Sequence, residues 1–389
     1  MDLIHRRAPD YWLIIPVIAL AGLGIVMVYS ASSIVAGDRF GDPTFFLKRQ
    51  VLWVLLGSAA LVVTHHIHYP ALRRLTPLLL AVAVLSLALV LVPGVGRVAG
   101  GARRWIAFGG PFAFQPSESA KLVLALYLAN FLTNRATVVR DLRAGVLPPL
   151  LVTGVMFVLV LMQPDLGTAM LMALLTLAML FASGARVGHL LMLMGAGVPV
   201  VAAAIAGEEY RRQRILAFLD PWADPQGAGF HIIQSLLALG SGGLLGVGLG
   251  SSRQKFFYLP ERETDFIFSI LGEELGLLGT GAVVLLFALF AVRGYRAARR
   301  APDRYGSLLA AGITTMILVQ AIINIGVTSG VLPVTGVPLP FVSFGGSSML
   351  FTMIGVGVLL NISQYARDAA PVHGEAGLPP VLTAARRPL

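Results

Sequence analysis

One acidic residue stands where a long polar segment of the chain ends and an apolar segment begins. Asp265 belongs to the run LPERETDFIF at 259–268, in which three acids and Arg262 fall within five residues. Two interpretations are open. Thr264 or Asp265 can cap the helix that follows, and a capping environment lowers the pKa of a carboxyl group. Alternatively, acids at this density predict a general base or a metal ligand, because neighbouring negative charges raise that pKa.

A second acid lies near a lysine at the start of another apolar segment. In the run QPSESAK at 115–121, Glu118 and Lys121 are three residues apart, so they share one face of the helix that Pro116 begins. The two can form a self-satisfied ion pair that helps the helix to start. They can also line a polar cavity at the outer face of the membrane. Ionisable groups inside a membrane span are energetically costly and usually face a cavity or a partner.

Basic residues gather in the same two parts of the chain. The polar segment 207–265 and the stretch before Glu118 contain Arg103, Arg104, Arg211, Arg212, Arg214, Arg253, Lys255 and Arg262. These residues can form a plain solvated surface. They also suit a phosphate or pyrophosphate group, which arginine binds with two parallel hydrogen bonds. Trp105 is typical of a membrane–water interface, where an anionic headgroup would lie.

Three further motifs are less specific. The glycine-rich run at 240–250 looks like a dinucleotide-binding loop, but the βαβ context that such a loop requires is missing. It therefore predicts tight packing or the approach of flexible backbone to a lipid headgroup. Asp165 can cap the helix after it and can also line the site. Ser347 lies in PLPFVSFGGSS at 338–348, where small residues permit close helix contact and hydroxyls can face a cavity.

The elements that position these residues must be membrane helices. Of the 389 residues, 57% are hydrophobic and 12% are charged, and the mean hydropathy is +0.82. A soluble domain carries about 25% charged residues, so lipid must be the solvent for most of this chain. The chain has no cysteine, which excludes disulfides and thiolate metal sites. Its net charge is +10, but the basic residues fall between apolar segments and form no run that predicts a nucleic-acid partner.

The sequence predicts an all-α integral membrane protein with about ten transmembrane helices. A helix needs about 20 apolar residues to cross a bilayer. The predicted spans are approximately 11–32, 47–64, 75–93, 118–133, 145–163, 165–183, 187–206, 266–292, 307–329 and 341–362. Between them, the large loop 207–265 is too apolar for a solvated linker and predicts short helices on the membrane surface. Residues 367–389 are rich in Pro, Ala and Gly and predict a disordered tail.

Basic residues also predict the orientation of the chain. Arginines are frequent near both termini and in the segments 135–143 and 293–304, whereas the short loops 33–46 and 330–340 hold few. Short loops rich in Lys and Arg stay in the cytoplasm. Both termini and the tail are therefore expected to be cytoplasmic, and the large loop extracytoplasmic.

Taken together, these runs resemble the SEDS family of shape, elongation, division and sporulation proteins, which includes FtsW, RodA and SpoVE. The resemblance extends over a membrane domain at 10–366. The run GLGSSRQKFFYLPE at 248–261 is more similar to the FtsW/SpoVE branch than to RodA. The matching runs occur in family order and are QPSESAK, QPDLGTA at 163–169, FLDPWADPQGAGFHIIQS at 218–235, LPERETDFIF, GEELG at 272–276 and PLPFVSFGGSS.

The resemblance implies a peptidoglycan glycosyltransferase in the cytoplasmic membrane of a bacterium, acting in cell division or cell-shape maintenance. Such an enzyme polymerises lipid II, a disaccharide-pentapeptide on undecaprenyl pyrophosphate, and works with a class B penicillin-binding protein. The family's essential aspartate corresponds to Asp265, and its QPSExxK acid and base correspond to Glu118 and Lys121. Inversion at the donor sugar needs one base, which we expect to be Asp265. Lys121 and the outer arginines, alone or with a divalent cation such as Mg²⁺ or Mn²⁺, would stabilise the leaving pyrophosphate.

Two other classes of protein would have a similar composition. A flippase for lipid-linked sugars also needs a polar membrane cavity, but it predicts charges spread across the depth of the bilayer. Here the charged residues gather at the outer face, which favours chemistry at the surface. A non-catalytic scaffold of the cell-wall synthesis complex would tolerate loss of Asp265.

Overall fold

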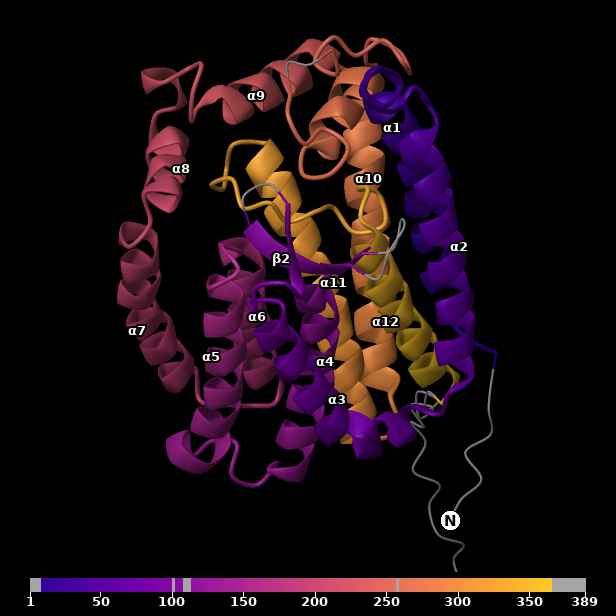
Figure 1. Cartoon of the computed structure of the whole chain (residues 1–389). Helices are drawn as coiled ribbons and strands as arrows, with labels where there is room; N and C mark the ends of the chain where they lie inside the picture. Colours follow the sequence, from indigo (N-terminus) through magenta and orange to yellow (C-terminus); the bar gives the residue numbers. More distant parts are fainter. Residues whose placement is uncertain (1–7, 100–101, 108–112, 257–258, 366–389) are drawn as a thin grey trace, which may run out of the picture.

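The computed structural model describes residues 8–99, 102–107, 113–256 and 259–365. Its long helices run side by side in one bundle (Figure 1). The α-helices in the described part of the chain are α1 (Ile14–Phe40), α2 (Phe45–His66), α3 (Tyr69–Leu89), α4 (Pro116–Asn134), α5 (Leu147–Leu161), α6 (Leu166–Ala182), α7 (Val187–Ala206), α8 (Glu209–Leu219), α9 (Phe230–Gly242), α10 (Ile267–Arg300), α11 (Arg304–Thr328) and α12 (Gly346–Gln364). Single helical turns precede α1 (Tyr11–Leu13) and α5 (Leu142–Val146), and another follows α8 (Pro221–Ala223).

The predicted membrane fold is confirmed, and each of the ten predicted spans falls on one of these helices. Among the described residues, eight helices are long and apolar enough to cross a bilayer. The other two predicted spans are α6, which has only 17 residues, and α4, which carries Glu118 and Lys121. Both are nevertheless part of the bundle, since α4 packs against α3 and α11, and α6 packs against α5 and α11.

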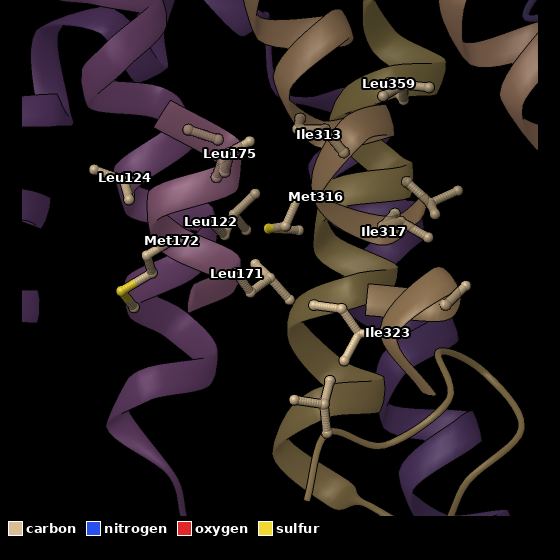
Figure 2. Close-up of a cluster of buried hydrophobic side chains, with 14 of the residues drawn as sticks. Leu122, Leu124, Leu171, Met172, Leu175, Ile313, Met316, Ile317, Ile323 and Leu359 are labelled. Carbon is tan, nitrogen blue, oxygen red and sulfur yellow. The ribbon is translucent and has the colours of Figure 1, made fainter. Parts of the chain in front are cut away.

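Apolar side chains fill the space between the central helices. Figure 2 shows leucine, isoleucine and methionine side chains of α4, α6, α11 and α12 packed together, among them Leu122, Leu171, Met316 and Leu359. Lipid tails are as apolar as these side chains, so close van der Waals packing rather than escape from water holds such helices together. The helix α7 is different: it is almost wholly exposed and follows one side of the bundle (Figure 1).

The all-α prediction missed one small element. Three short strands, β1 (Gly96–Ala99), β2 (Ala102–Ala107) and β3 (Ala113–Phe114), form an antiparallel sheet in the order β1-β2-β3. Arg97 pairs with Trp105 across β1 and β2. The sheet lies next to the helices that hold the candidate site, since β2 packs against α4 and β3 against α12.

The large loop contains the short helices that the sequence predicts. The helix α8 continues beyond α7, and α9 then lies across the end of the bundle, where it packs against α10 and α11 (Figure 1). The position of these helices on a membrane surface stays a prediction.

The two ends of the described chain meet at the opposite end of the bundle. The main-chain amide of Asp10 donates to Ser363 Oγ at 3.1 Å, and Arg293 Nε donates to the Asp10 carboxylate at 3.0 Å. The start of α1, the end of α12 and the later part of α10 are therefore neighbours, far from α9 (Figure 1). The predicted disordered tail at 367–389 lies outside the described residues.

Candidate functional site

Asp265 lies in a tight turn just before α10, and the capping interpretation is wrong for this acid. The N-cap of α10 is Phe266, and no side chain caps the helix. Thr264 instead donates its hydroxyl to the carboxylate of Glu261 at 3.0 Å. The turn is closed by the amides of Thr264 and Phe266, which both donate to the main-chain oxygen of Glu261. Asp265 is therefore free of a capping role.

The surroundings of Asp265 suit a general base. Burial, together with the nearby negative charge of Glu261, raises the pKa of Asp265 to about 7, while Arg214 and Arg104 act in the opposite direction. Its carboxylate lies beside Gly336, where an added Cβ would be 3.4 Å from Oδ2. A carboxyl group with a pKa near neutral pH can accept a proton and release it again at physiological pH.

Two of the predicted arginines lie near enough to Asp265 for their positive charge to act on its carboxylate. Arg104 donates Nε to the main-chain oxygen of Gln163 at 2.8 Å, and Arg214 donates Nη1 to the main-chain oxygen of Val334 at 3.0 Å. The Arg214 guanidinium also lies 4.3 Å from the centre of the Tyr210 ring. Both side chains are thus held by their surroundings while their positive charge acts on Asp265.

Asp165 and Arg211 complete this side of the site. The predicted cap is confirmed, because Asp165 Oδ1 accepts from the amide of Thr168 at 3.0 Å. Asp165 is also close enough to raise the pKa of Asp265. Arg211 donates to the main-chain oxygens of Ala204 and Leu161, and it lines a pocket of about 40 Å³ together with Arg214.

Four other predicted residues are not among the charged groups that act on Asp265. Arg103 donates to the main-chain oxygen of Leu91 at 3.1 Å. Lys255 is buried and pairs with Glu274 at 3.1 Å. The side chain of Arg253 is exposed, and Arg262 lies 3.9 Å from Glu263. Their predicted contact with substrate stays a prediction, and the pairing of Lys255 indicates a structural role for this residue.

Glu118 and Lys121 form a buried pair that also reaches across to α11. Lys121 Nζ donates to Glu118 Oε1 at 2.9 Å and to Gln320 Oε1 at 2.7 Å. Gln320 in turn donates to the main-chain oxygen of Pro338 at 3.0 Å. With only 2% and 4% of the Lys121 and Glu118 side chains exposed, the pair is no part of an open surface. It joins the start of α4 to the loop that precedes α12.

Two further residues of the site, Asn324 and Gln320, are not among those predicted from the sequence. Asn324 donates its side-chain amide to the main-chain oxygens of Asp265 and Val337, each at 2.8 Å. Gln320 lies four residues earlier on α11 and binds Lys121. A polar pair at this spacing within an apolar span shares one helix face, and this signal could have identified them.

A larger cavity lies beside the Asp265 turn, with Thr264 in its wall. Its volume is about 240 Å³, and it is lined by Arg49, Trp53, Arg97, Trp105, Ala113, Thr264, Phe344, Gly345 and Gly346. Side chains alternate along a strand, so β2 turns Trp105 into this cavity and Arg104 the other way, towards Asp265. The first turn of α12 fits only because residue 346 is glycine: a Cβ there would lie 2.2 Å from the Trp53 ring.

The last predicted residue, Ser347, ties this region together. Its hydroxyl accepts from the amide of Gln115 at 3.1 Å and lies 3.3 Å from the main-chain oxygen of Ala113. It therefore holds the start of α4 and strand β3 to α12. Among the described residues, no group of three His, Asp or Glu side chains is placed to hold a metal ion. A divalent cation at Asp265 would take its remaining oxygen ligands from water, main-chain carbonyls or a bound phosphate.

Comparison with known proteins agrees with the resemblance seen in the sequence. The model of the cell cycle protein family FtsW/RodA/SpoVE matches residues 11–368. The chain is 46% identical to stage V sporulation protein E of Bacillus subtilis, with 93% of this chain and 99% of the relative covered. It is 44% identical to the probable peptidoglycan glycosyltransferase FtsW of Geobacter metallireducens, with 91% and 94% covered.

Solved structures give the same result. A chain from a peptidoglycan synthase complex matches with a TM-score of 0.75 and 34% identity, covering 92% of this chain and 98% of that one. The rod shape determining protein RodA of Thermus thermophilus matches with a TM-score of 0.68 and 32% identity, covering 92% and 97%. The higher identity to SpoVE and FtsW than to RodA agrees with the branch that the run at 248–261 predicts. By sequence and by fold, this chain belongs to the FtsW/RodA/SpoVE family.

Proposed function

We propose that this membrane protein is a peptidoglycan glycosyltransferase that polymerises lipid II, with Asp265 as its general base. One observation carries the assignment of the base. The pKa of Asp265 is raised to about 7, two arginines act on its carboxylate, and the adjoining Thr264 lines the larger, arginine-containing cavity. The relatives of this chain support the reaction, since the FtsW of Geobacter metallireducens is named as a probable peptidoglycan glycosyltransferase.

The proposed step is a single in-line displacement. The acceptor sugar hydroxyl attacks the anomeric carbon of the donor sugar, and the bond from that carbon to the pyrophosphate oxygen breaks. Asp265 accepts the hydroxyl proton as the new glycosidic bond forms. The leaving pyrophosphate gains negative charge, which fixed guanidinium groups such as those of Arg104 and Arg214 would stabilise.

The two hollows fit a reaction between two lipid-linked substrates. Arg211 and Arg214 line the smaller pocket, with Arg104 near Arg214, and Arg49 and Arg97 line the larger cavity. Each hollow offers guanidinium groups for one pyrophosphate headgroup. The Trp53 and Trp105 rings beside Arg49 and Arg97 provide flat apolar surfaces, which suit a sugar ring or the start of a polyprenyl chain.

Glu118 and Lys121 have a supporting role in this proposal. Lys121 is buried and already binds Glu118 and Gln320, and Gln320 donates to the main-chain oxygen of Pro338. Lys121 therefore orders the loop at Pro338 and does not bind phosphate directly. A divalent cation, if held by Asp265, would supply further positive charge to stabilise the leaving pyrophosphate.

The test is polymerisation of lipid II by the purified protein in detergent. Asp265→Asn keeps the size of the side chain and removes the base, so the rate should fall by about 100-fold or more. Glu209→Gln changes an exposed acid on α8 and serves as the control, with a rate close to wild type. An Asp265→Asn protein that polymerises at the wild-type rate would overturn the assignment. A flippase would give no polymer in detergent, where there are no two sides to connect.

A class B penicillin-binding protein, a transpeptidase, is the proposed partner. A homologous chain belongs to a peptidoglycan synthase complex described as coordinating polymerization and crosslinking, which supports this pairing. Co-purification of the two proteins from detergent-solubilised membranes would test it.

We also propose that the protein lies in the bacterial cytoplasmic membrane with both termini in the cytoplasm. The proximity of Asp10 to Ser363 puts the two ends on the same side of the bundle. Because the chain has no cysteine, a single introduced thiol reports its own side. In intact cells, an impermeant thiol reagent should label Gln226→Cys in the large loop and leave Arg140→Cys between α4 and α5 unlabelled. The reverse pattern would overturn the orientation.

A further inference from the structure

Two buried acids on α10 have no part in the proposed reaction, yet both grip the large loop. Glu273 and Glu274 are almost fully buried, and they follow Asp265 by eight and nine residues. Buried carboxylates are costly unless they are paired and hydrogen-bonded. Both acids find their partners in the loop segment 252–255, which leads towards Asp265.

The contacts are numerous and specific. Glu273 accepts from the hydroxyl of Ser252, from the amide of Arg253 at 2.8 Å and from the amide of Gln254 at 3.3 Å. Glu274 accepts from Lys255 Nζ at 3.1 Å and from Ser30 Oγ of α1 at 2.7 Å. The two acids therefore fasten the loop to α10, and Glu274 adds α1 to the same network.

The helix is interrupted directly after these acids. Gly276 has φ 64° and ψ −160°, a left-handed conformation in the middle of α10. The glycine-rich run fills the break: the amides of Leu277 and Leu278 donate to the main-chain oxygens of Gly243 and Leu244 at 2.9 and 3.2 Å. A Cβ at Gly276 would lie 2.4 Å from the amide nitrogen of Gly246. Of the two interpretations open for this run, tight packing is the one that the structure supports.

The break makes the first part of α10 a separate short piece. Residues 267–275 carry the Asp265 turn at one end and the two acids at the other. At the turn, Phe344 donates its amide to the oxygen of Glu263 at 2.8 Å, and Ser343 donates its hydroxyl to the oxygen of Thr264 at 2.6 Å. The piece is thus held at both ends by contacts from outside α10.

From this arrangement we propose that Glu273, Glu274 and Lys255 are positioning residues, which set the place of Asp265 by fixing residues 267–275 against the large loop and α1. The importance of this place for catalysis rests on the proposed function. A buried ion pair is a poor stabiliser compared with a well-packed neutral pair, so its value here lies in the single geometry that it selects. In this proposal the three residues act through the position of Asp265 and not through contact with the substrate.

The test uses the chain's lack of cysteine. Asp265→Cys introduces the only thiol, and its rate of reaction with a small charged reagent reports the place of residue 265 without any need for catalysis. The double change Lys255→Met with Glu274→Gln removes both charges of the pair, so neither partner is left as a buried charge without the other. In the Asp265→Cys background, we expect the double change to alter the reaction rate of the thiol by about fivefold or more. In the protein that keeps Asp265, we expect it to lower kcat by about tenfold or more and to leave KM little altered, since small misplacement of reacting groups is costly.

A matched control separates this effect from the loss of any ion pair. Lys48 and Asp42 form an exposed pair at 2.8 Å, so Lys48→Met with Asp42→Asn removes the same charges from the surface. This control should leave the thiol rate and kcat unchanged. Circular dichroism and thermal unfolding in detergent show that each variant is folded. Should the single variants Lys255→Met and Glu274→Gln unfold because each leaves one buried charge unpaired, the double variant still gives the answer.

The outcomes separate the two proposals. A folded double variant with a wild-type thiol rate and a wild-type kcat overturns the positioning role. A changed thiol rate in a protein whose unmodified form makes no polymer overturns the proposed function and leaves the positioning role standing.

Discussion

Asn324 holds Asp265 by its main chain, because its side-chain amide donates at 2.8 Å to the oxygen of Asp265 and, at the same distance, to that of Val337. One turn earlier on α11, Gln320 accepts from Lys121 and donates to the main-chain oxygen of Pro338. The two amides thus attach the loop before α12 to the Asp265 turn and to the Glu118–Lys121 pair. One face of α11 is the common support of the whole site.

Removing the Asn324 amide should therefore loosen the site. Asn324→Ala removes the donor from two carbonyls, one buried and one part-buried, which should cost about 1–3 kcal/mol of stability and reduce kcat. Asn324→Asp should be worse, because a carboxylate would face two carbonyl oxygens. Thr315→Ala, on the same helix, removes only a contact to Tyr295 and should resemble wild type. Thermal unfolding and polymerisation rates measure both effects. Equal results for Asn324→Ala and Thr315→Ala would contradict this role.

The activity should depend on pH in a direction that the charged neighbours set. With the pKa of Asp265 raised to about 7, the basic form increases as pH rises through 7, and kcat/KM should rise with it. Glu261→Gln removes a negative neighbour, so the midpoint should move to lower pH. Arg214→Gln removes a positive neighbour, so the midpoint should move to higher pH. Rate profiles between pH 5 and 9 give the midpoints, and shifts in the same direction for both variants would contradict the assignment.

The arginines of the larger cavity should matter for substrate binding. Arg49→Gln and Arg97→Gln each remove one guanidinium from the cavity wall, so KM for lipid II should rise by about tenfold, the loss expected for one charged hydrogen bond. Arg97 is exposed, so its loss should change the melting temperature little. Arg299→Gln, near the end of α10 that lies close to the termini, is the control for net charge. A KM for Arg97→Gln equal to that of Arg299→Gln would show that no headgroup binds there.

The buried Glu118–Lys121 pair should be sensitive to the loss of either member. Glu118→Ala or Lys121→Ala leaves an unpaired buried charge, which costs about 3–5 kcal/mol when a buried pair is broken. Each should impair polymerisation more than Glu261→Ala, whose side chain is exposed. The double neutral variant, Glu118→Gln with Lys121→Met, should recover folding. If it also recovers full activity, the charges themselves are not needed for the reaction.

Much of this fold is visible in the sequence, because a membrane span needs a long apolar run and leaves a strong signal. Asp265 is also visible, since three acids and an arginine fall within five residues at the junction of polar loop and apolar helix. Its neighbours are not. Lys255 and Arg214 are both basic residues of the large loop, but Lys255 forms an ion pair with Glu274 of α10. Only the folded chain distinguishes a cation that faces Asp265 from one that neutralises a buried acid.

The different roles of Arg103 and Arg104 likewise become visible only in the folded chain. Both are arginines next to Trp105, and the sequence treats them alike, yet only Arg104 acts on Asp265. The strand β2 makes the difference, and its short, glycine-flanked sequence gave the all-α prediction no reason to expect a sheet. In contrast, Gln320 and Asn324 carried a usable signal, since amides four residues apart in an apolar span seldom lack a partner.

Because side chains alternate between the two faces of β2, the number of residues in its hairpin is more constrained than their types. Consecutive residues of this strand serve opposite sides of the reaction centre, with Arg104 towards the acid and Trp105 towards the larger cavity. Inserting or deleting one residue before Arg104 would exchange the two sides. We therefore expect homologous chains to vary the residue types of this hairpin more freely than the number of residues in it.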